Sequence, residues 1–193
     1  MILADFTSRQ VKATPFPHVR AVHALPEALA SNVLDWLDAD APWSLTEASF
    51  YEQQEFSLLS ADLPEAVEPL TSCALVASIA RELGASLSSG PLELVDVNAH
   101  RLLSGMTIRL HNDFLGTAEE SHRMLIQLNR GWSQEQGGLL MLFEEDRPES
   151  VADMVLPVHR SAFGFEISEC SHHAVSTVHN GVRDTIVYTF KKT

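Results

Sequence analysis

The second half of the chain consists of short β-favouring runs separated by turn residues, and this pattern limits the possible folds more than any other feature. Eight such runs occur in about 100 residues, with glycines between several of them, which is typical of a β-sandwich or a barrel. The runs cover residues 92–103, 106–110, 124–128, 139–143, 155–158, 162–167, 173–178 and 185–190.

The first half of the chain is expected to be mainly helical. Apolar residues recur at three-to-four spacing after Pro26, and residues 64–87 are rich in Ala and Leu. Between these two helices, residues 49–59 favour one strand. Because there is no repeat, low-complexity tract or long linker, the sequence predicts a single domain over 1–193. Residues 1–90 would give helical support and residues 91–193 the β-core, so the fold class is α+β, mainly β, with the N-terminal helices packed on one sheet.

The charge balance excludes some classes of partner. Lys and Arg number 13 against 26 Asp and Glu, which gives a formal net charge of −13 and a pI of about 5.0. Proteins that bind nucleic acid or anionic membranes usually carry a basic patch, and the only adjacent basic pair here is Lys191-Lys192. Two cysteines do not make a disulfide framework, and no apolar run approaches the roughly 20 residues of a membrane span. A cytoplasmic protein is therefore expected.

His111-Asn112-Asp113 is the strongest local signal for chemistry. On an extended segment, residues two apart point to the same side, so one imidazole nitrogen and one carboxylate oxygen can reach a common ion. His173, at the start of a later strand run, is a candidate third ligand. Two histidines and one carboxylate form the facial triad of non-haem Fe(II) oxygenases. The alternative is that these residues are an ordinary solvated pair in a loop.

Arg183 and Thr185 open the last strand run and can face one side together. A guanidinium binds a carboxylate through two parallel hydrogen bonds, and a hydroxyl can add a third. An arginine in a sheet-rich core is costly unless it meets an anion. The alternatives are an exposed arginine on an edge strand, or an arginine paired with a protein acid such as Asp184. Arg101 and Arg109 are expected to form ordinary surface ion pairs.

Four segments of the C-terminal half together resemble the Fe(II)- and 2-oxoglutarate-dependent dioxygenases, most closely their prolyl-hydroxylase-like branch. The resemblance implies a double-stranded β-helix of the jelly-roll or cupin type, in which 91–193 is the catalytic core. It implies iron held by His111, Asp113 and His173 rather than by the adjacent His172. The segments are GMTIRLHND (105–113), HRMLIQLNRGW (122–132), GGLLMLF (137–143) and HAVSTVHNGVRDTIVYTF (173–190), and FPHVRAVHALPEALASNVLDWL (16–37) resembles the usual lead-in.

The resemblance also implies how 2-oxoglutarate would be held. Arg183 would bind its distal carboxylate, with Thr185 assisting, and O2 would be the second co-substrate. Prolyl hydroxylases often have a tyrosine where this chain has Gln127, and the Gln127 amide can offer a hydrogen bond in its place. Because Asp113 is present, the resemblance favours hydroxylation over halogenation, in which a small residue leaves room for chloride.

The implied function is hydroxylation of an unactivated C–H bond in an amino acid or a peptidyl side chain, with release of succinate and CO2. Enzymes of this size include some that modify peptide natural products. A non-catalytic module of the same fold that binds a metal or a small acid is the first alternative. A nucleic-acid demethylase is the second, and the acidity of the chain disfavours it. Residues 50–59 and 114–121 are the two candidate segments for closing over the substrate.

Overall fold

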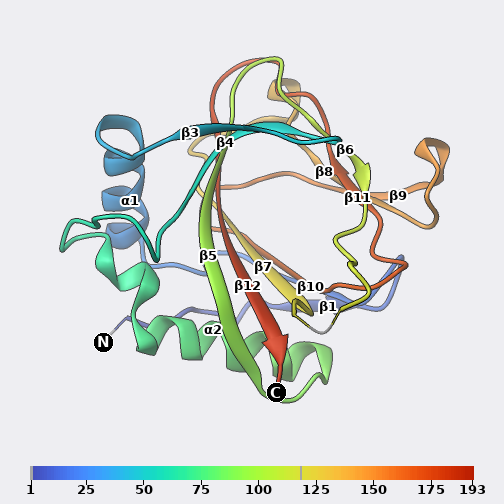
Figure 1. Ribbon diagram of the computed structural model, residues 1–193, viewed down its shortest axis with the longest axis horizontal. Helices are drawn as coiled ribbons and strands as arrows, with labels where there is room; N and C mark the ends of the chain where they lie inside the picture. The colour runs from blue at the N-terminus through green and yellow to red at the C-terminus, as the bar shows by residue number, and fades with distance from the viewer. Residues whose placement is uncertain (1, 118) are drawn as a thin grey trace.

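The computed structural model describes residues 2–117 and 119–193, which form two sheets and two helices (Figure 1). Helix α1 is Glu27–Ala39 and begins directly after Pro26, while α2 is Cys73–Leu87. Ser72 begins α2 by accepting a hydrogen bond from the Leu75 N–H, so the helix predicted over 64–87 starts later. Short 3-10 helices cover η1 Glu68–Thr71, η2 Gln134–Gln136 and η3 Pro148–Ser150. Neither α-helix has the length and apolar character of a membrane span.

Every strand pair in the two sheets is antiparallel. The large sheet has the order β1-β2-β10-β7-β12-β5-β4-β3, and the small sheet has the order β6-β11-β8-β9. The α+β, mainly β class is confirmed. The strands are β1 Gln10–Lys12, β2 His18–Ala21, β3 Ser44–Glu47, β4 Glu52–Ser57, β5 Leu92–Leu102, β6 Ile108–His111, β7 His122–Gln127, β8 Leu140–Phe143, β9 Val151–Val155, β10 Ala162–Glu166, β11 His173–Val175 and β12 Arg183–Lys192.

Both helices predicted within residues 1–90 are present, but this part also contributes four strands to the large sheet, where the sequence predicts only one. β2 pairs with β10 on one side and β1 on the other, so it lies inside the sheet. Three of its four residues are buried, so the alternation that would reveal a half-exposed strand is absent. β3 pairs with β4 as a local hairpin, but three of its four residues are exposed and it carries no apolar alternation that would predict a strand. The strand predicted over 155–158 lies earlier, at β9.

The two faces of β12 serve different purposes. Ile186, Tyr188 and Phe190 are fully buried in the core between the large sheet and the helices. Arg183 and Thr185 point to the opposite face, toward the small sheet. Because side chains alternate along a strand, one strand both anchors the helices and supplies polar groups to the space between the sheets.

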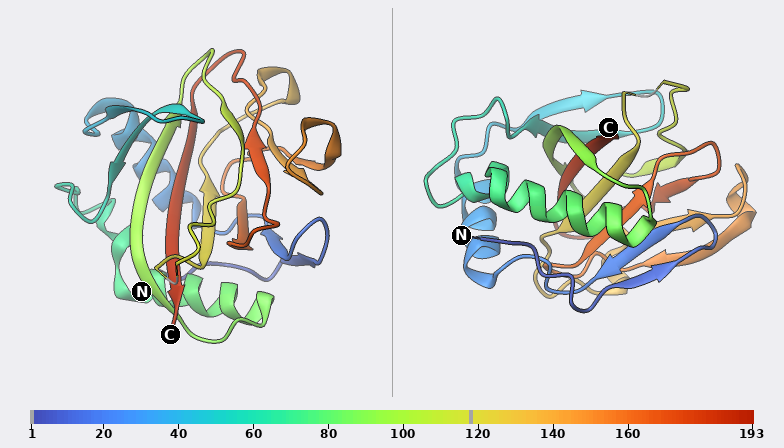
Figure 2. Two further views of the ribbon diagram at one scale, coloured as in Figure 1. Left: turned by 45° about the vertical axis from the view of Figure 1, so that its right-hand side comes forward. Right: turned by 90° about the horizontal axis from the view of Figure 1, so that it is seen from below.

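Helix α2 lies across the outer face of the large sheet, and this packing confirms the predicted placement of helices on one sheet (Figure 2). The close approach depends on Gly164 in β10. A Cβ at this position would lie 2.6 Å from Leu83 Cδ1 of α2 and 2.8 Å from Met124 Cε. Glycine therefore allows the helix to sit directly on the sheet. Helix α2 thus covers one face of the large sheet, and the opposite face is available for the site.

His122, fully buried at the start of β7, makes the stability of the fold depend on pH. Its Nε2 lies 2.7 Å from Ser89 Oγ and its Nδ1 lies 2.9 Å from Ser121 Oγ. Burial lowers the pKa of His122 to about 4. Because the unfolded chain binds this proton at higher pH than the folded chain, stability is lost as the pH falls from about 6.5 to about 4.

We expect roughly 2–3 kcal/mol of this loss to come from His122 alone. Urea unfolding of the wild type and of a His122→Gln variant between pH 7 and pH 4 measures it. The variant should show a shallower decline of the unfolding free energy than the wild type. Parallel declines in the two proteins would contradict this assignment.

Candidate active site and metal centre

Strand pairing brings the two histidines of the predicted triad face to face. His111 ends β6 and His173 begins β11, and their Cα atoms are register partners in the small sheet. Asp113 follows β6 by two residues. One ligand atom from each of the three side chains lies within 4.8 Å of the other two. The distant segments 111–113 and 173 therefore meet at one point, which the spacing alone could only suggest.

Both imidazoles are oriented by the backbone. The Nδ1 of His111 lies 2.8 Å from the Arg109 carbonyl oxygen, and the Nδ1 of His173 lies 2.8 Å from the Ser171 carbonyl oxygen. A carbonyl can only accept, so each Nδ1 must donate a proton. Each Nε2 is then the nitrogen available as a ligand, and both face Asp113.

Asp113 presents its carboxylate to the two rings without forming ordinary hydrogen bonds to them. The Nε2–O separations are 3.5 Å to His111 and 3.4 Å to His173, which are long for hydrogen bonds. The Oδ2 atom is buried and has no hydrogen-bond partner among the described residues. Burial raises the pKa of Asp113, but the facing histidines and the Arg123 guanidinium outweigh it and hold the pKa well below its usual value. The three groups thus converge on a space between them.

Arg123 of β7 also contacts the carboxylate, and nothing in its sequence context indicated this role. Its Nη1 lies 3.1 Å from Asp113 Oδ1 and its Nη2 lies 3.1 Å from Glu120 Oε2. β7 is flanked by β10 and β12, so its inward side chains point toward the small sheet. A lone arginine in a strand carries no local signal, and only the assembled sheets reveal it.

Arg183, at the start of β12, is buried with an incomplete set of partners. Its Nε donates to the Gly138 carbonyl at 2.9 Å and its Nη1 donates to Thr185 Oγ1 at 2.9 Å. Its Nη2 is buried and has no partner among the described residues. Burial lowers the pKa of Arg183 to about 10, so the group stays charged near neutral pH. Gly138 is required here, because a Cβ would lie 2.8 Å from Arg183 Cδ.

Thr185 and Gln127 form a chain behind Arg183. The Thr185 hydroxyl accepts from Arg183 and donates to Gln127 Oε1 at 2.9 Å. A hydroxyl has one proton, so Thr185 has no second donor to offer while this bond holds. Thr185 lines the same cavity as Arg183, whereas Gln127 lies behind it and lines a separate shallow hollow.

Asp184 does not neutralise Arg183, because it points to the helix face of the sheet. There it binds Arg101, with Arg101 Nε 2.7 Å from Oδ1 and Nη2 2.8 Å from Oδ2. Arg101 also contacts Asp38 of α1 at 2.7 Å. The interpretation of Arg101 as a surface ion pair is therefore wrong, since its side chain is only 10% exposed. Among the described residues, no acidic side chain pairs with Arg183.

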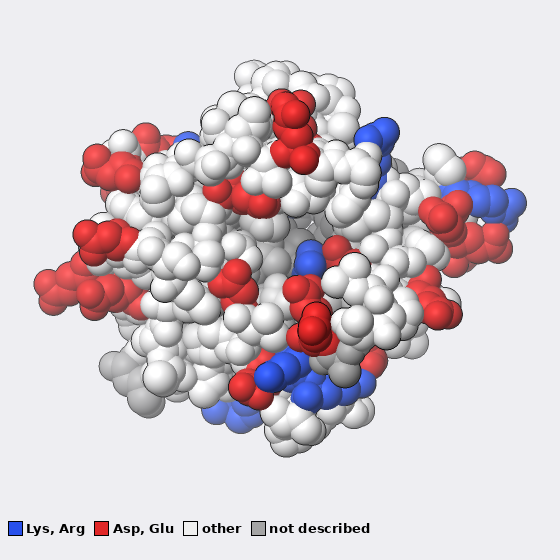
Figure 3. All heavy atoms as spheres, in the orientation of Figure 1, with Lys and Arg blue, Asp and Glu red and all other residues white. Residues whose placement is uncertain are grey.

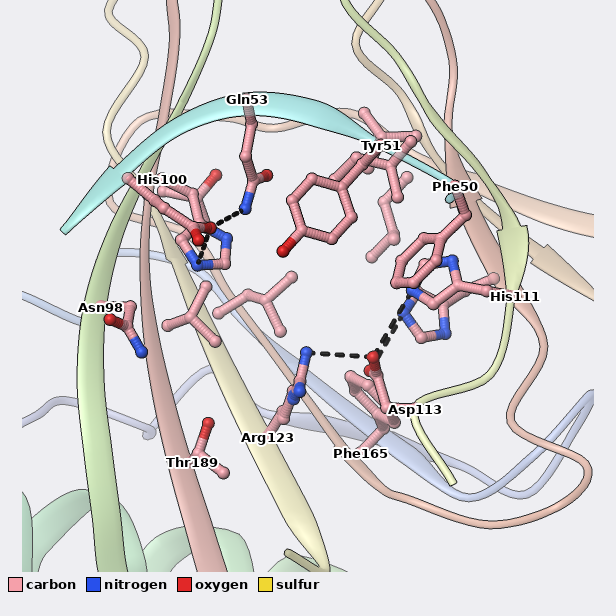
Figure 4. Close-up of a pocket in the computed structure, with 18 of the residues that line it drawn as sticks. Phe50, Tyr51, Gln53, Asn98, His100, His111, Asp113, Arg123, Phe165 and Thr189 are labelled. Atoms are coloured by element: carbon pink, nitrogen blue, oxygen red, sulfur yellow. Dashed lines mark hydrogen bonds and ion pairs between the residues drawn. The ribbon is translucent and has the colours of Figure 1, made fainter. Parts of the chain in front are cut away.

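The triad, Arg123, Arg183 and Thr185 line one cavity of about 460 Å³ between the two sheets, whereas Gln127, Asp184 and Arg101 lie outside it. Figure 4 shows Asp113 and Arg123 on one side of it and His100 and Asn98 of β5 on the other, with β4 crossing above. His100 and Asn98 line this wall of the cavity. The mouth is hollowed in the space-filling view, and acidic side chains outnumber basic ones among the charged groups around it (Figure 3).

A cavity between two antiparallel sheets, with two imidazoles and one carboxylate converging at its side, defines the class of non-haem Fe(II) oxygenases. Residues 97–190 match the family described as the 2OG-Fe(II) oxygenase superfamily. No curated protein matches the chain. The matched segment contains the triad, Arg183 and Thr185, and the chain has the fold of the prolyl-hydroxylase-like 2OG-Fe(II) oxygenases.

Solved structures support the double-stranded β-helix fold over most of the chain. A prolyl-4-hydroxylase from Pseudomonas putida superposes with a TM-score of 0.69 at 19% identity, covering 91% of this chain and 92% of that chain. A prolyl hydroxylase from Trichoplax adhaerens, in complex with a hypoxia inducible factor peptide fragment, gives 0.75 at 17%, covering 91% and 83%. The epimerase SnoN from nogalamycin biosynthesis gives 0.68 at 10%, covering 91% and 78%.

The family implies Fe(II), 2-oxoglutarate and O2 as cofactor and co-substrates, and the residues present fit them. Two imidazole Nε2 atoms and a carboxylate are a suitable donor set for Fe(II). The unpartnered Asp113 Oδ2 and the free Arg183 Nη2 are buried polar atoms that lack protein partners. A metal ion would satisfy the first and an organic acid the second. When bound, the iron supplies the redox chemistry that couples 2-oxoglutarate breakdown to substrate oxidation.

Proposed function

We propose that the protein is a hydroxylase that oxidises an unactivated C–H bond of an amino acid or a peptidyl side chain, releasing succinate and CO2. His111 Nε2, Asp113 and His173 Nε2 hold the iron, and Arg183 holds the distal carboxylate of 2-oxoglutarate. The cytoplasm as its location and the tailoring of a peptide natural product are further parts of this proposal.

The observation that carries the proposal is the buried Nη2 of Arg183. A desolvated guanidinium is expensive unless an anion reaches it. Asp184 points away from Arg183 and binds Arg101, so among the described residues no acidic side chain pairs with the Arg183 guanidinium. The cavity that Arg183 lines is the one that holds the triad, and a dicarboxylate between them would have one end on each.

Thr185 and Gln127 are positioning residues in this proposal. The hydroxyl of Thr185 fixes Arg183 Nη1, and the Gln127 oxygen fixes the hydroxyl. Arg183 is thereby held in one orientation before the co-substrate arrives, which reduces the ordering cost of binding. The role suggested for the Gln127 amide, a hydrogen bond directly to 2-oxoglutarate, is not favoured by its place behind Thr185.

A substrate of amino-acid or peptide type suits the outer part of the cavity. Glu55, Glu120 and Asn98 line it, so polar groups are available for an amide or a charged group. The acidic surroundings of the mouth in Figure 3 disfavour a polyanionic nucleic acid. The Trichoplax adhaerens neighbour was solved with a peptide, which supports a peptide substrate.

Succinate formation tests the proposal. Purified protein with Fe(II), 2-oxoglutarate and O2 should form succinate, and mass spectrometry should find a +16 Da product among free amino acids and peptides encoded near the gene. Omission of iron or O2 should stop both. Tight binding of Fe(II) and 2-oxoglutarate without succinate from any pool would favour the non-catalytic binding module. Failure to bind 2-oxoglutarate would overturn the proposal.

A further inference from the structure

The roof of the cavity carries an acidic group whose partners are neutral. Residues 50–57, here called the roof segment, begin beside the small sheet, where Tyr51 bridges to Ile108 of β6. They continue as β4 along β5 of the large sheet. Gln53 and Glu55 are two residues apart on β4, so both side chains face the cavity, as Gln53 does in Figure 4.

Glu55 has no cationic partner among the described residues. Its Oε2 accepts from the Gln53 amide nitrogen at 2.5 Å and lies 3.8 Å from His100 Nε2. Burial lowers the pKa of His100 to about 4, against the opposing effect of Glu55, so this imidazole is neutral near pH 7. No Lys or Arg in the described chain lies within ion-pair distance of Glu55. The Glu55 side chain is 25% exposed, and it lines the cavity.

Gln53 adds an independent observation. Its side chain is buried at 2% exposure, and its Oε1 has no donor among the described residues. The amide nitrogen of Gln53 already donates to Glu55, so the amide oxygen is the atom that can accept a hydrogen bond from a ligand. A buried amide oxygen without a donor is unusual. The roof therefore offers two acceptors side by side, one charged and one neutral, and both lack the donors that would satisfy them.

The other charged side chains that line the cavity already have protein partners or are assigned to 2-oxoglutarate. Arg123 is bound to Asp113 and Glu120. Asp96 accepts hydrogen bonds from Ser57 Oγ at 2.7 Å and from the Asn98 amide at 3.0 Å. In the proposed function, Arg183 is reserved for 2-oxoglutarate. The part of the cavity under the roof segment therefore has a surplus of negative charge, centred on Glu55.

We propose that Glu55, together with Gln53, receives a cationic group of the substrate, an ammonium or a guanidinium. This inference rests on the proposed function, since it assigns the substrate class of the same cavity. Glu55 lies next to His100 at one end of the roof segment. At the other end, the ring of Phe50 stacks on His111 of the triad. The roof segment thus spans from the metal centre to the cation site, and it would fix one end of the substrate while another carbon lies near the iron.

Anaerobic calorimetric titration of the enzyme loaded with Fe(II) and 2-oxoglutarate tests the inference without turnover. The probes are L-arginine and L-lysine, with L-citrulline and L-norleucine as counterparts of similar size whose side chains are uncharged. Each is used with a free and with an acetylated α-amino group. A cationic probe should bind about 10–100-fold tighter than its neutral counterpart, as expected for hydrogen bonds to charged groups. The acetylated arms show whether the side chain or the α-amine supplies the charge.

A Glu55→Gln variant keeps the shape of the roof and removes the charge, so it should lose that preference. Glu52→Gln is the matched control, since Glu52 is exposed on the same strand and alternates to the other face. It should bind every probe as the wild type does. The inference is overturned if neither a cationic side chain nor a free α-amino group strengthens binding, or if no cationic probe binds. If 2-oxoglutarate binding persists in these proteins, that failure leaves the proposed function standing; if it is absent in the wild type, the proposed function fails as well.

Discussion

A His173→Ala enzyme is expected to lose Fe(II) binding and succinate formation by more than about 100-fold. Loss of a group that merely supports a metal ligand already costs 10–100-fold, and removal of a ligand should cost more. His173 Nε2 and His111 Nε2 face one carboxylate, so two donors cannot replace three. Anaerobic metal titration and a succinate assay at saturating 2-oxoglutarate measure the two effects.

His172→Ala is the matched control, because His172 directly precedes His173 in the chain and does not line the cavity. It should bind Fe(II) within a few-fold of the wild type. If His172→Ala lost the metal and His173→Ala kept it, the ligand assignment would be off by one residue. Thermal unfolding of both variants without metal should be close to that of the wild type, which shows that any loss arises in the site.

An Arg183→Met enzyme should bind 2-oxoglutarate at least about 30-fold more weakly, while its fold without the co-substrate is little affected. Truncating one partner of a buried charge pair costs 2–5 kcal/mol or more. In the absence of 2-oxoglutarate, the same substitution removes a buried cation with an unpartnered Nη2, which offsets the two hydrogen bonds that are lost. Calorimetry with the metal-loaded protein measures the binding.

Arg101→Met separates this effect from general damage to the sheet. Arg101 also lies within the large sheet, but it binds Asp184 on the helix face. Its removal should lower the free energy of unfolding by about 3 kcal/mol, because Asp184 is left buried and unpaired. Binding of 2-oxoglutarate should change little. If the two variants lost 2-oxoglutarate binding to the same extent, Arg183 would not be its specific partner.

The parts of the structure that local patterns describe were predictable. Pro26 marks the start of α1, and the runs ending in Leu128 and Phe143 match β7 and β8 closely. His111 and Asp113 stand two apart, so their common direction follows from strand geometry. The resemblance of the glycine-rich and histidine-rich segments to a known family then selected His173 over His172.

The remainder depends on which strands become neighbours. Arg123, Gln53 and Glu55 are ordinary polar residues in their own segments, and their meaning arises only when β4 crosses the cavity and β7 faces it. The pairing of Arg101 with Asp184 joins residues 83 positions apart, and no local spacing signals it. Of the two candidate closing segments, residues 50–59 include the roof segment, which lines the cavity. The other, 114–121, contributes Glu120, and its residue 118 lies outside the described residues.

Strands β4 and β3 lie at one edge of the large sheet, so the residues that contact the substrate in our proposal and those of the metal centre tolerate substitution differently. His173 on β11 and Arg183 on β12 belong to interior strands, where a substitution disturbs neighbouring strands on both sides. The hairpin of residues 44–57 has one free border, so its inward residues can drift or be exchanged with less disturbance. Substitutions in this hairpin can therefore change the substrate specificity while the metal centre is kept. Exchange of the hairpin is a direct route to engineering that specificity.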